Sequence, residues 1–143
     1  MGYGYSYSCP NCTYTYTCEE GVGMLFPIVY EETIKKAKSG KMGKTLKSFF
    51  DEHDNGAIDA RYVTLCCNKC GNLTNRMDLS MYVPEKGIKA LGFNLDKYCE
   101  KYADYPHKCG KCRSSMHIVT KDEIMLCPNC REPLQRDKTF CWD

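Results

Sequence analysis

Cys109-Gly110-Lys111-Cys112 and Cys127-Pro128-Asn129-Cys130 lie 14 residues apart near the end of the chain, and this stretch decides the fold. Two cysteines separated by two residues can bind one metal ion together, because a tight turn points both sulfurs the same way. The same spacing occurs at Cys67-Asn68-Lys69-Cys70 and at Cys9-Pro10-Asn11-Cys12. Two such pairs complete a tetrahedral site with Zn–S distances of about 2.3 Å. The sequence therefore predicts two structural zinc ions.

We expect neighbouring cysteine pairs to share an ion. Site 1 then has the ligands Cys9, Cys12, Cys67 and Cys70, and site 2 has the ligands Cys109, Cys112, Cys127 and Cys130. The 14 residues between Cys112 and Cys127 suit the hairpin of a compact zinc ribbon, whereas the 54 residues between Cys12 and Cys67 require an insertion. Other pairings would close longer loops at an entropic cost, although this cost grows slowly with loop length.

The number of cysteines, 12 in 143 residues, also permits disulfide bonds or redox-active thiols. Disulfides indicate an oxidising compartment and usually a leader sequence, and the chain opens with no such leader. A thioredoxin-like redox site would need a βαβ pattern around its Cys-x-x-Cys motif. Structural metal in a cytoplasmic protein is the favoured interpretation, with iron as an alternative ion in the same sites.

The fold class predicted from these patterns is a small, metal-stabilised α+β protein with two four-cysteine zinc ribbons. Residues 1–83 are expected to form the first ribbon, with a helical hairpin inserted at about 24–54. Residues 84–106 are expected to form a linker with a short helix at about 94–102, and residues 107–143 the second ribbon. Alternating β-branched and aromatic residues predict the strands beside the cysteine pairs, and residues 134–142 are expected to form the last strand.

The inserted hairpin is predicted from helical spacing of apolar residues. Tyr30, Ile34 and Ala37 lie on one side of the first helix, which Pro27 can begin and Ser39-Gly40 ends. The second helix is expected at about 43–53. The lysines of this segment form a cationic run that we interpret as a solvated helix face.

The stretch from Asp51 to Tyr62 approaches the pattern of an EF-hand calcium loop. His53 and Tyr62 stand at its third and twelfth positions, where calcium ligands are required. We therefore interpret Asn55-Gly56 as a turn that leads into a strand.

Four cysteines, together with His107 and His117 near the last cysteine pairs, remain outside the predicted sites. Cys18, Cys66, Cys99 and Cys141 belong to no pair and are expected to be buried as small apolar groups. Cys66 could replace its neighbour Cys67 as a ligand, but strand alternation points the two side chains in opposite directions and favours Cys67. His107 and His117 are expected to be structural or exposed, because four cysteines already satisfy a zinc ion.

Charge and hydropathy limit the partners. The formal charge of +2 falls to about −2 when eight thiolates and two divalent ions are counted, so the chain lacks the basic surface typical of non-specific nucleic-acid binding. No stretch approaches the ~20 apolar residues that a transmembrane helix needs, and no membrane role is expected.

With these motifs in place, the chain resembles small bacterial tandem zinc-ribbon proteins of no assigned function. The resemblance rests on the tyrosine-rich segment before Cys9, on Gly-Met-Leu-Phe-Pro at 23–27 and on Leu-Ser-Met-Tyr-Val-Pro at 79–84. The stretch from Cys109 to Cys130 is also similar to ribbons of transcription and translation factors, which implies nucleic acid as a partner. It is similar as well to the rubredoxin-type tail of rubrerythrins, which implies an iron electron carrier.

The sequence shows no Gly-rich phosphate loop, nucleophile elbow or His-Glu-x-x-His motif. The expected function is therefore a non-enzymatic protein-interaction or adaptor module with a protein partner. Nucleic-acid binding and electron transfer by iron are the alternatives.

Overall fold

The computed structural model describes residues 2–90, 92 and 95–142, and in this part of the chain it is a small α+β fold with three helices. The strands form three separate three-stranded sheets, in the orders β2-β1-β9, β5-β4-β8 and β3-β6-β7. The elements, in chain order, are β1 (Gly2–Ser8), β2 (Thr15–Glu20), α1 (Phe26–Lys38), α2 (Lys44–Glu52), β3 (Ala57–Ile58), β4 (Tyr62–Cys67), β5 (Leu73–Met77), β6 (Met81–Pro84), α3 (Leu95–Tyr98), β7 (Cys99–Ala103), β8 (Met116–Ile118) and β9 (Gln135–Trp142).

The chain divides into two compact units. Unit 1 comprises Met1–Met24, Tyr62–Arg76 and Pro106–Asp143, and unit 2 comprises Leu25–Arg61 and Met77–Tyr105. These units differ from the predicted ranges 1–83, 84–106 and 107–143. The segment predicted as a linker belongs to unit 2 as far as Tyr105, where it supplies the last residue of β6 and all of β7 to a sheet with β3. Unit 2 therefore contains more than a helical hairpin, because two separate stretches of chain build it.

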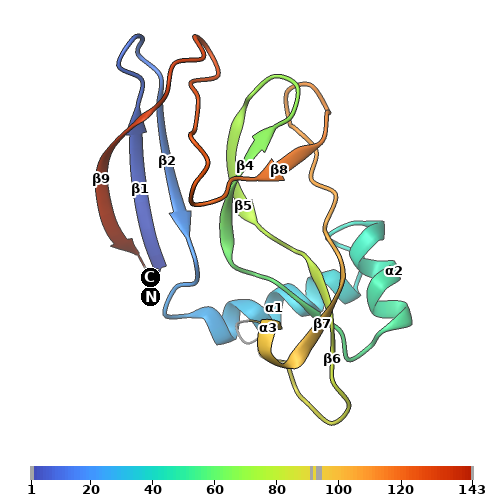
Figure 1. Ribbon diagram of the computed structural model, residues 1–143. Helices are drawn as coiled ribbons and strands as arrows, with labels where there is room; N and C mark the ends of the chain where they lie inside the picture. Colours follow the sequence, from blue (N-terminus) through green and yellow to red (C-terminus); the bar gives the residue numbers. More distant parts are fainter. Residues whose placement is uncertain (1, 91, 93–94, 143) are drawn as a thin grey trace. The chain divides into compact units, whose positions relative to one another are not determined.

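In unit 1, the first and last strands of the chain lie side by side (Figure 1). β1 pairs antiparallel with β9, from Gly2 opposite Trp142 to Ser8 opposite Gln135. On its other edge, β1 pairs with β2. Tyr7, Tyr16 and Cys18 of this sheet pack with Leu73 of β5 in a small apolar cluster. The final strand was predicted at 134–142, in agreement with β9.

Unit 2 contains the predicted helices at nearly the predicted positions. Pro27 lies in the first turn of α1, where its missing N–H costs no hydrogen bond, and the chain turns at Gly40 with a φ of +85°. Of the predicted apolar positions of α1, Tyr30 and Ala37 are buried and Ile34 is half-buried. Leu46, Phe49 and Phe50 of α2 are buried as well.

The short helix predicted at 94–102 is confirmed only in its first half. Asn94 lies outside the described residues, α3 ends at Tyr98, and the chain continues directly as strand β7. β7 pairs with β6, with Cys99 opposite Pro84 and Lys101 opposite Tyr82. Pairing across the sheet therefore overrides the helical spacing of Tyr98, Cys99 and Tyr102.

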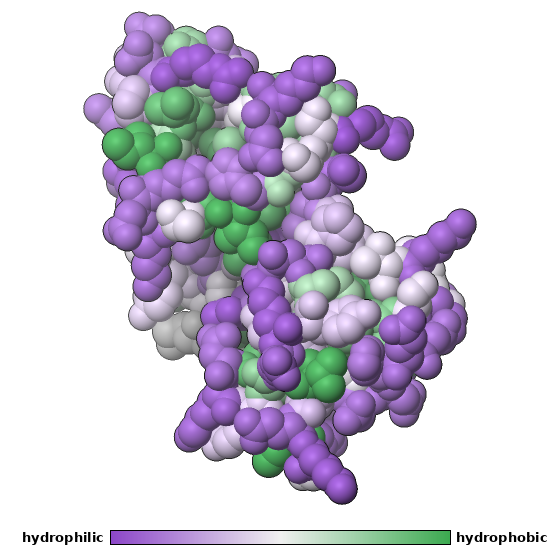
Figure 2. Space-filling model, turned by 45° about the vertical axis from the view of Figure 1, so that its right-hand side comes forward, coloured by the Kyte–Doolittle hydropathy of each residue, from purple (hydrophilic) through white to green (hydrophobic). Residues whose placement is uncertain are grey.

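Most of the surface seen in Figure 2 is hydrophilic, and the hydrophobic side chains gather in small separate areas. Among the described residues, no helix is both long and apolar enough to cross a membrane.

Candidate metal centres

All four Cys-x-x-Cys segments form the same kind of turn. In each, the N–H of the first cysteine donates to the carbonyl of the fifth residue after it; the pairs are Cys9–Tyr14 (3.0 Å), Cys67–Asn72 (2.9 Å), Cys109–Ser114 (2.8 Å) and Cys127–Glu132 (2.8 Å). We call these segments the cysteine turns. In the last three, the residue after the second cysteine donates back to the carbonyl of the first. The repeated bonds fix the backbone, so that both sulfurs of a turn lie close together.

The residue that follows the second cysteine has a left-handed backbone in these three turns. The φ angles are +74° at Gly71, +64° at Arg113 and +65° at Arg131. Glycine adopts this conformation freely, whereas a residue with a Cβ loses about 1 kcal/mol there. The turn therefore imposes its conformation on two arginines as well as on the glycine.

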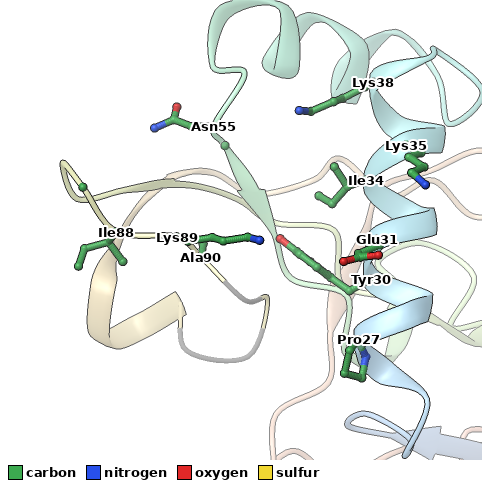
Figure 3. A pocket seen from close by; sticks show the side chains of 12 residues that line it. Pro27, Tyr30, Glu31, Ile34, Lys35, Lys38, Asn55, Ile88, Lys89 and Ala90 are labelled. Carbon is green, nitrogen blue, oxygen red and sulfur yellow. The ribbon is translucent and has the colours of Figure 1, made fainter.

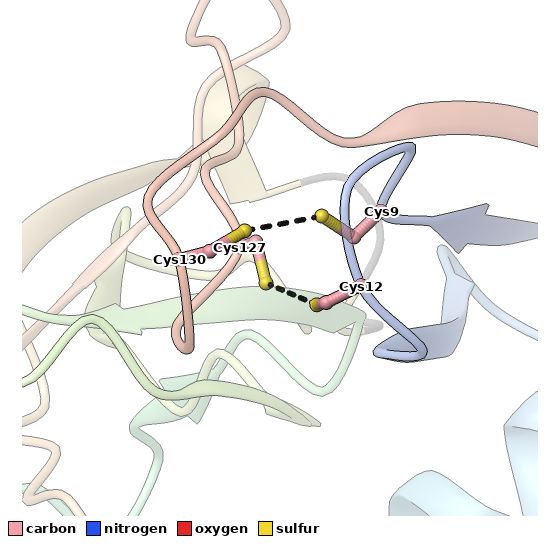
Figure 4. Close-up of side chains that lie close together, drawn as sticks. All are labelled: Cys9, Cys12, Cys127 and Cys130. Carbon is pink, nitrogen blue, oxygen red and sulfur yellow. Dashed lines mark hydrogen bonds between the residues drawn. The ribbon is translucent and has the colours of Figure 1, made fainter.

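The first cluster joins opposite ends of the chain. Cys9 and Cys12 come from the turn between β1 and β2, and Cys127 and Cys130 from the turn that precedes β9 (Figure 4). The Sγ atoms of Cys9 and Cys130 are 3.3 Å apart, and those of Cys12 and Cys127 are 3.5 Å apart. The pairing of β1 with β9 brings these two turns together.

The second cluster joins the middle of the chain to the segment before β8. Cys67 and Cys70 come from the turn between β4 and β5, and Cys109 and Cys112 from the turn that precedes β8. The Sγ separations are 3.4 Å between Cys67 and Cys112 and 3.7 Å between Cys70 and Cys109. β4 pairs directly with β8, with Cys67 opposite Met116, and this pairing positions the cluster.

Both clusters fit a tetrahedral metal ion. Within each cluster, the four Sγ atoms all lie within 4.8 Å of one another. Four sulfurs at about 2.3 Å from a zinc ion would be about 3.8 Å apart, close to the observed separations. A disulfide requires about 2.05 Å, and all twelve cysteines, which lie in the described part of the chain, are free. The geometry suits thiolates around an ion.

Backbone N–H groups support the charged form of several sulfurs. The N–H groups of Asn11, Lys69 and Lys111 donate to the first sulfur of their turns, Cys9, Cys67 and Cys109, at 3.4 Å each. Such bonds lower the pKa of the Cys109 thiol, and hydrogen bonds from Ser114 together with neighbouring sulfurs lower the pKa of Cys112 to about 6. Burial outweighs the same kind of bond at Cys9 and raises the pKa of that thiol to about 12, so a metal ion has to displace its proton. A metal ligand must be deprotonated, so these bonds favour metal binding.

The structure confirms that the eight predicted cysteines gather in two groups of four, but it corrects their pairing. The predicted site 1, with Cys9, Cys12, Cys67 and Cys70, and the predicted site 2, with Cys109, Cys112, Cys127 and Cys130, do not form. Instead, the first cysteine turn of the sequence pairs with the last, and the second pairs with the third. The prediction favoured the pairing that closes the shortest loops. The entropic cost of closing a longer loop grows only with the logarithm of its length, and the strand pairs β1–β9 and β4–β8 outweigh it.

The chain matches no protein-family model, and neither a curated protein nor a solved structure is significantly similar to it. The interpretation of the two clusters therefore rests on their geometry and chemistry.

The remaining cysteines lie outside both clusters. Cys67, and not Cys66, belongs to the second cluster, as strand alternation predicted. Cys18 is buried as expected, Cys66 and Cys99 are only half-buried, and Cys141 is exposed, which corrects the prediction for these three. Their thiols contribute to packing to different degrees.

His107 and His117 are absent from the clusters. His107 is buried, and His117 lies between Asn68 and Glu123, with its ring nitrogens 2.6 Å from Asn68 Oδ1 and 2.7 Å from Glu123 Oε2. His117 therefore ties a cysteine turn to the strand β8. The sequence predicted that His117 is structural or exposed. It did not predict the contacts with Asn68 and Glu123, which lie 49 and 6 positions away in the sequence.

The acidic residues of the EF-hand-like stretch do not converge. Asp51 pairs with Lys47 and Asp54 with Lys38, whereas Asp59 is buried against Arg61. The chain turns at 54–55 and enters β3, as the alternative interpretation predicted.

Proposed function

We propose that this protein is a non-enzymatic zinc-binding module, in which two structural zinc ions hold unit 1 together. The observation that carries the proposal is the pair of four-cysteine clusters, each built from distant segments. In the first cluster, the contacting sulfurs belong to cysteines that are separated by 115 and by 121 positions in the sequence. In the second cluster, the separations are 39 and 45 positions. An ion in each cluster would therefore act as a long-range crosslink.

The donor set supports a structural role for the metal. A catalytic zinc ion keeps an open coordination position for water, whereas four thiolates complete the tetrahedron. Structural zinc contributes about 10 kcal/mol or more to the folding of small domains. In the described part of unit 1, one apolar cluster has four buried residues (Tyr7, Tyr16, Cys18 and Leu73), and a second has four that include two of the cysteine ligands (Leu65, Cys67, Cys109 and Met116). Metal binding would therefore supply much of the stability of this unit.

We further propose that the module binds a cytoplasmic protein partner, as an adaptor. The support lies in unit 2, where Leu25 and Ile28 at the start of α1 are 64% and 60% exposed. Exposed apolar side chains grouped at one place on the surface are typical of protein-binding sites. Membership in the bacterial tandem zinc-ribbon proteins that the sequence resembles is part of this proposal.

Metal analysis of protein purified from its native host tests the metal assignment. We expect two zinc ions per chain, a colourless solution, and loss of unit 1 secondary structure when a chelator removes the metal under reducing conditions. A red solution with bound iron would favour an electron carrier instead. Metal-free protein with the eight thiols cross-linked would contradict the proposal.

Crosslinking in native lysate tests the adaptor role. The wild-type chain should capture a specific protein that a Leu25→Ser/Ile28→Ser variant loses, while the zinc content of both stays equal. Retention of the chain on single-stranded or duplex nucleic acid at ~50 mM salt, without any captured protein, would favour nucleic-acid binding instead.

A further inference from the structure

Unit 2 contains a groove of about 940 Å³ between α1, the turn at 54–56 and the loop at 87–90 (Figure 3). Ligand pockets for small organic molecules typically enclose about 300 to 1,000 Å³. All of the lining residues belong to unit 2, and none is a cysteine of the two clusters. Any function of the groove is therefore separate from the metal sites.

The walls of the groove are apolar. Tyr30 and Ile34 lie one turn apart on the same side of α1, and Ile88 and Ala90 of the loop contribute the opposite wall. Tyr30 is 9% exposed, and its hydroxyl accepts a 3.4 Å hydrogen bond from the N–H of Ile58. Its ring is therefore fixed in place as part of the wall and does not depend on a ligand for its position.

The charges around the groove are mainly positive. Lys35 and Lys38 line it from α1 and Lys89 from the loop, against one carboxylate, Glu31. Lys38 forms an ion pair with Asp54 at 3.3 Å. Lys35 and Lys89 form no ion pair with any residue in the described part of the chain, and Figure 3 shows Lys89 extending from the loop toward α1. Two ammonium groups on opposite sides of an apolar groove are thus free of ion pairs among the described residues, with the carboxylate of Glu31 as the one acidic group of the lining.

We infer that this groove binds a small organic anion with an apolar body. The apolar body would lie between Ile34 and the Ile88–Ala90 wall, and the anionic head would pair with Lys35 and Lys89. An apolar site with a few charged groups at its edge selects ligands by both hydrophobic burial and charge. A carboxylate, sulfonate or phosphate head fits this chemistry equally well.

A pair of fluorescent probes tests both parts of the inference on the intact, metal-loaded protein. Anilinonaphthalene sulfonate carries an anionic head, whereas N-phenylnaphthylamine has the same aromatic body without a charge. We expect the anionic probe to bind at least tenfold more tightly. The variant Lys35→Ala/Lys89→Ala should lose this difference, while its affinity for the neutral probe stays within twofold of wild type.

A matched control separates local from overall charge. Lys36→Ala/Lys44→Ala removes the same two charges from exposed positions of unit 2 outside the groove, and it should bind the anionic probe like the wild type. Equal affinities for the two probes, or equal losses in the two double variants, would overturn the inference. So would the absence of any binding of either probe at millimolar concentration.

Amide chemical shifts locate the bound probe. Addition of the anionic probe should shift the signals of Ile34, Ile88 and Ala90. Shifts confined to Leu25 and Ile28, or to unit 1, would contradict the assignment to the groove. Displacement of the probe by dodecanoate, but not by dodecyl phosphate, would identify a carboxylate as the preferred head; the reverse would identify a phosphate.

Discussion

Arg131 Nη2 lies 3.3 Å from the carbonyl oxygen of Cys70, so a residue of one cysteine turn donates a hydrogen bond to a turn of the other cluster. Its guanidinium also lies directly above Gly71, where an added Cβ would be 2.3 Å from Nη1. The two cysteine clusters are thereby joined by a hydrogen bond from a side chain of one to the backbone of the other.

Replacement of Gly71 by alanine tests this connection. The new Cβ would strain the left-handed backbone, by about 1 kcal/mol, and displace Arg131 from Cys70, which would cost about another 1 kcal/mol. We expect chemical denaturation of the zinc-loaded protein to show a lower free energy of unfolding by about 2 kcal/mol. In an Arg131→Ala background, the same substitution should cost only the backbone strain. Equal costs in both backgrounds would show that the arginine contact contributes nothing.

At Arg113, a change to glycine should have the opposite effect on the free energy of unfolding. This residue has a φ of +64° and is exposed, so Arg113→Gly should relieve backbone strain and raise the free energy of unfolding by up to about 1 kcal/mol. Arg113→Ala is the control, because it removes the same side chain but keeps the Cβ. Both variants should bind two metal ions. A gain in the alanine variant equal to that of the glycine variant would assign the effect to the side chain instead.

The buried carboxylate of Asp59 depends on Arg61. Asp59 is 1% exposed and accepts three side-chain bonds from Arg61, from Nη2 at 2.6 Å and from Nε at 3.0 and 3.1 Å, and a backbone bond from the same residue. Arg61→Ala would leave this buried carboxylate without its cation and lower the free energy of unfolding by roughly 2 to 3 kcal/mol. The loss stays below that of a fully buried ion pair, because the arginine itself is half exposed. Thermal unfolding should show the loss. The variant Lys44→Ala, with the same charge change at an exposed position, should unfold like the wild type.

The buried hydroxyl of Tyr30 should make the free energy of unfolding depend on pH in the alkaline range. Burial raises its pKa to about 12, whereas an unfolded tyrosine titrates near pH 10. The unfolded chain therefore loses its proton first, and the contribution of Tyr30 to stability, complete below pH 10, decreases as the pH rises toward 12. Denaturation of the wild type between pH 9 and pH 12 should show a steeper loss than denaturation of Tyr30→Phe. Parallel pH profiles would mean that the Tyr30 hydroxyl titrates normally in the folded protein.

The sequence predicted the local features better than the long-range ones. The cysteine turns, the helices at 26–38 and 44–52 and the final strand follow from spacing, because each depends on neighbours within a few residues. The pairing of the turns does not, because the register of β1 with β9 and of β4 with β8 joins residues far apart. In the same way, β7 at Cys99–Ala103 forms where its own spacing predicts helix, since β6 provides a partner strand.

The groove of unit 2 was also missed. Lys35 belongs to a cationic run that resembles an ordinary solvated helix face, and Lys89 comes from a segment predicted as linker. Only the fold of unit 2 places the two lysines at the same groove. The sequence places Tyr30 and Ile34 on one side of a helix, but this spacing is as typical of a buried helix face as of the wall of a pocket.

Native mass spectrometry of two double variants tests the pairing of the cysteine turns most directly. Cys9→Ser/Cys127→Ser removes ligands from one cluster only, so this variant should retain one metal ion. Cys9→Ser/Cys67→Ser removes a ligand from each cluster, so it should retain none. The opposite result, no ion in the first variant and one ion in the second, would contradict the pairing of the outermost turns.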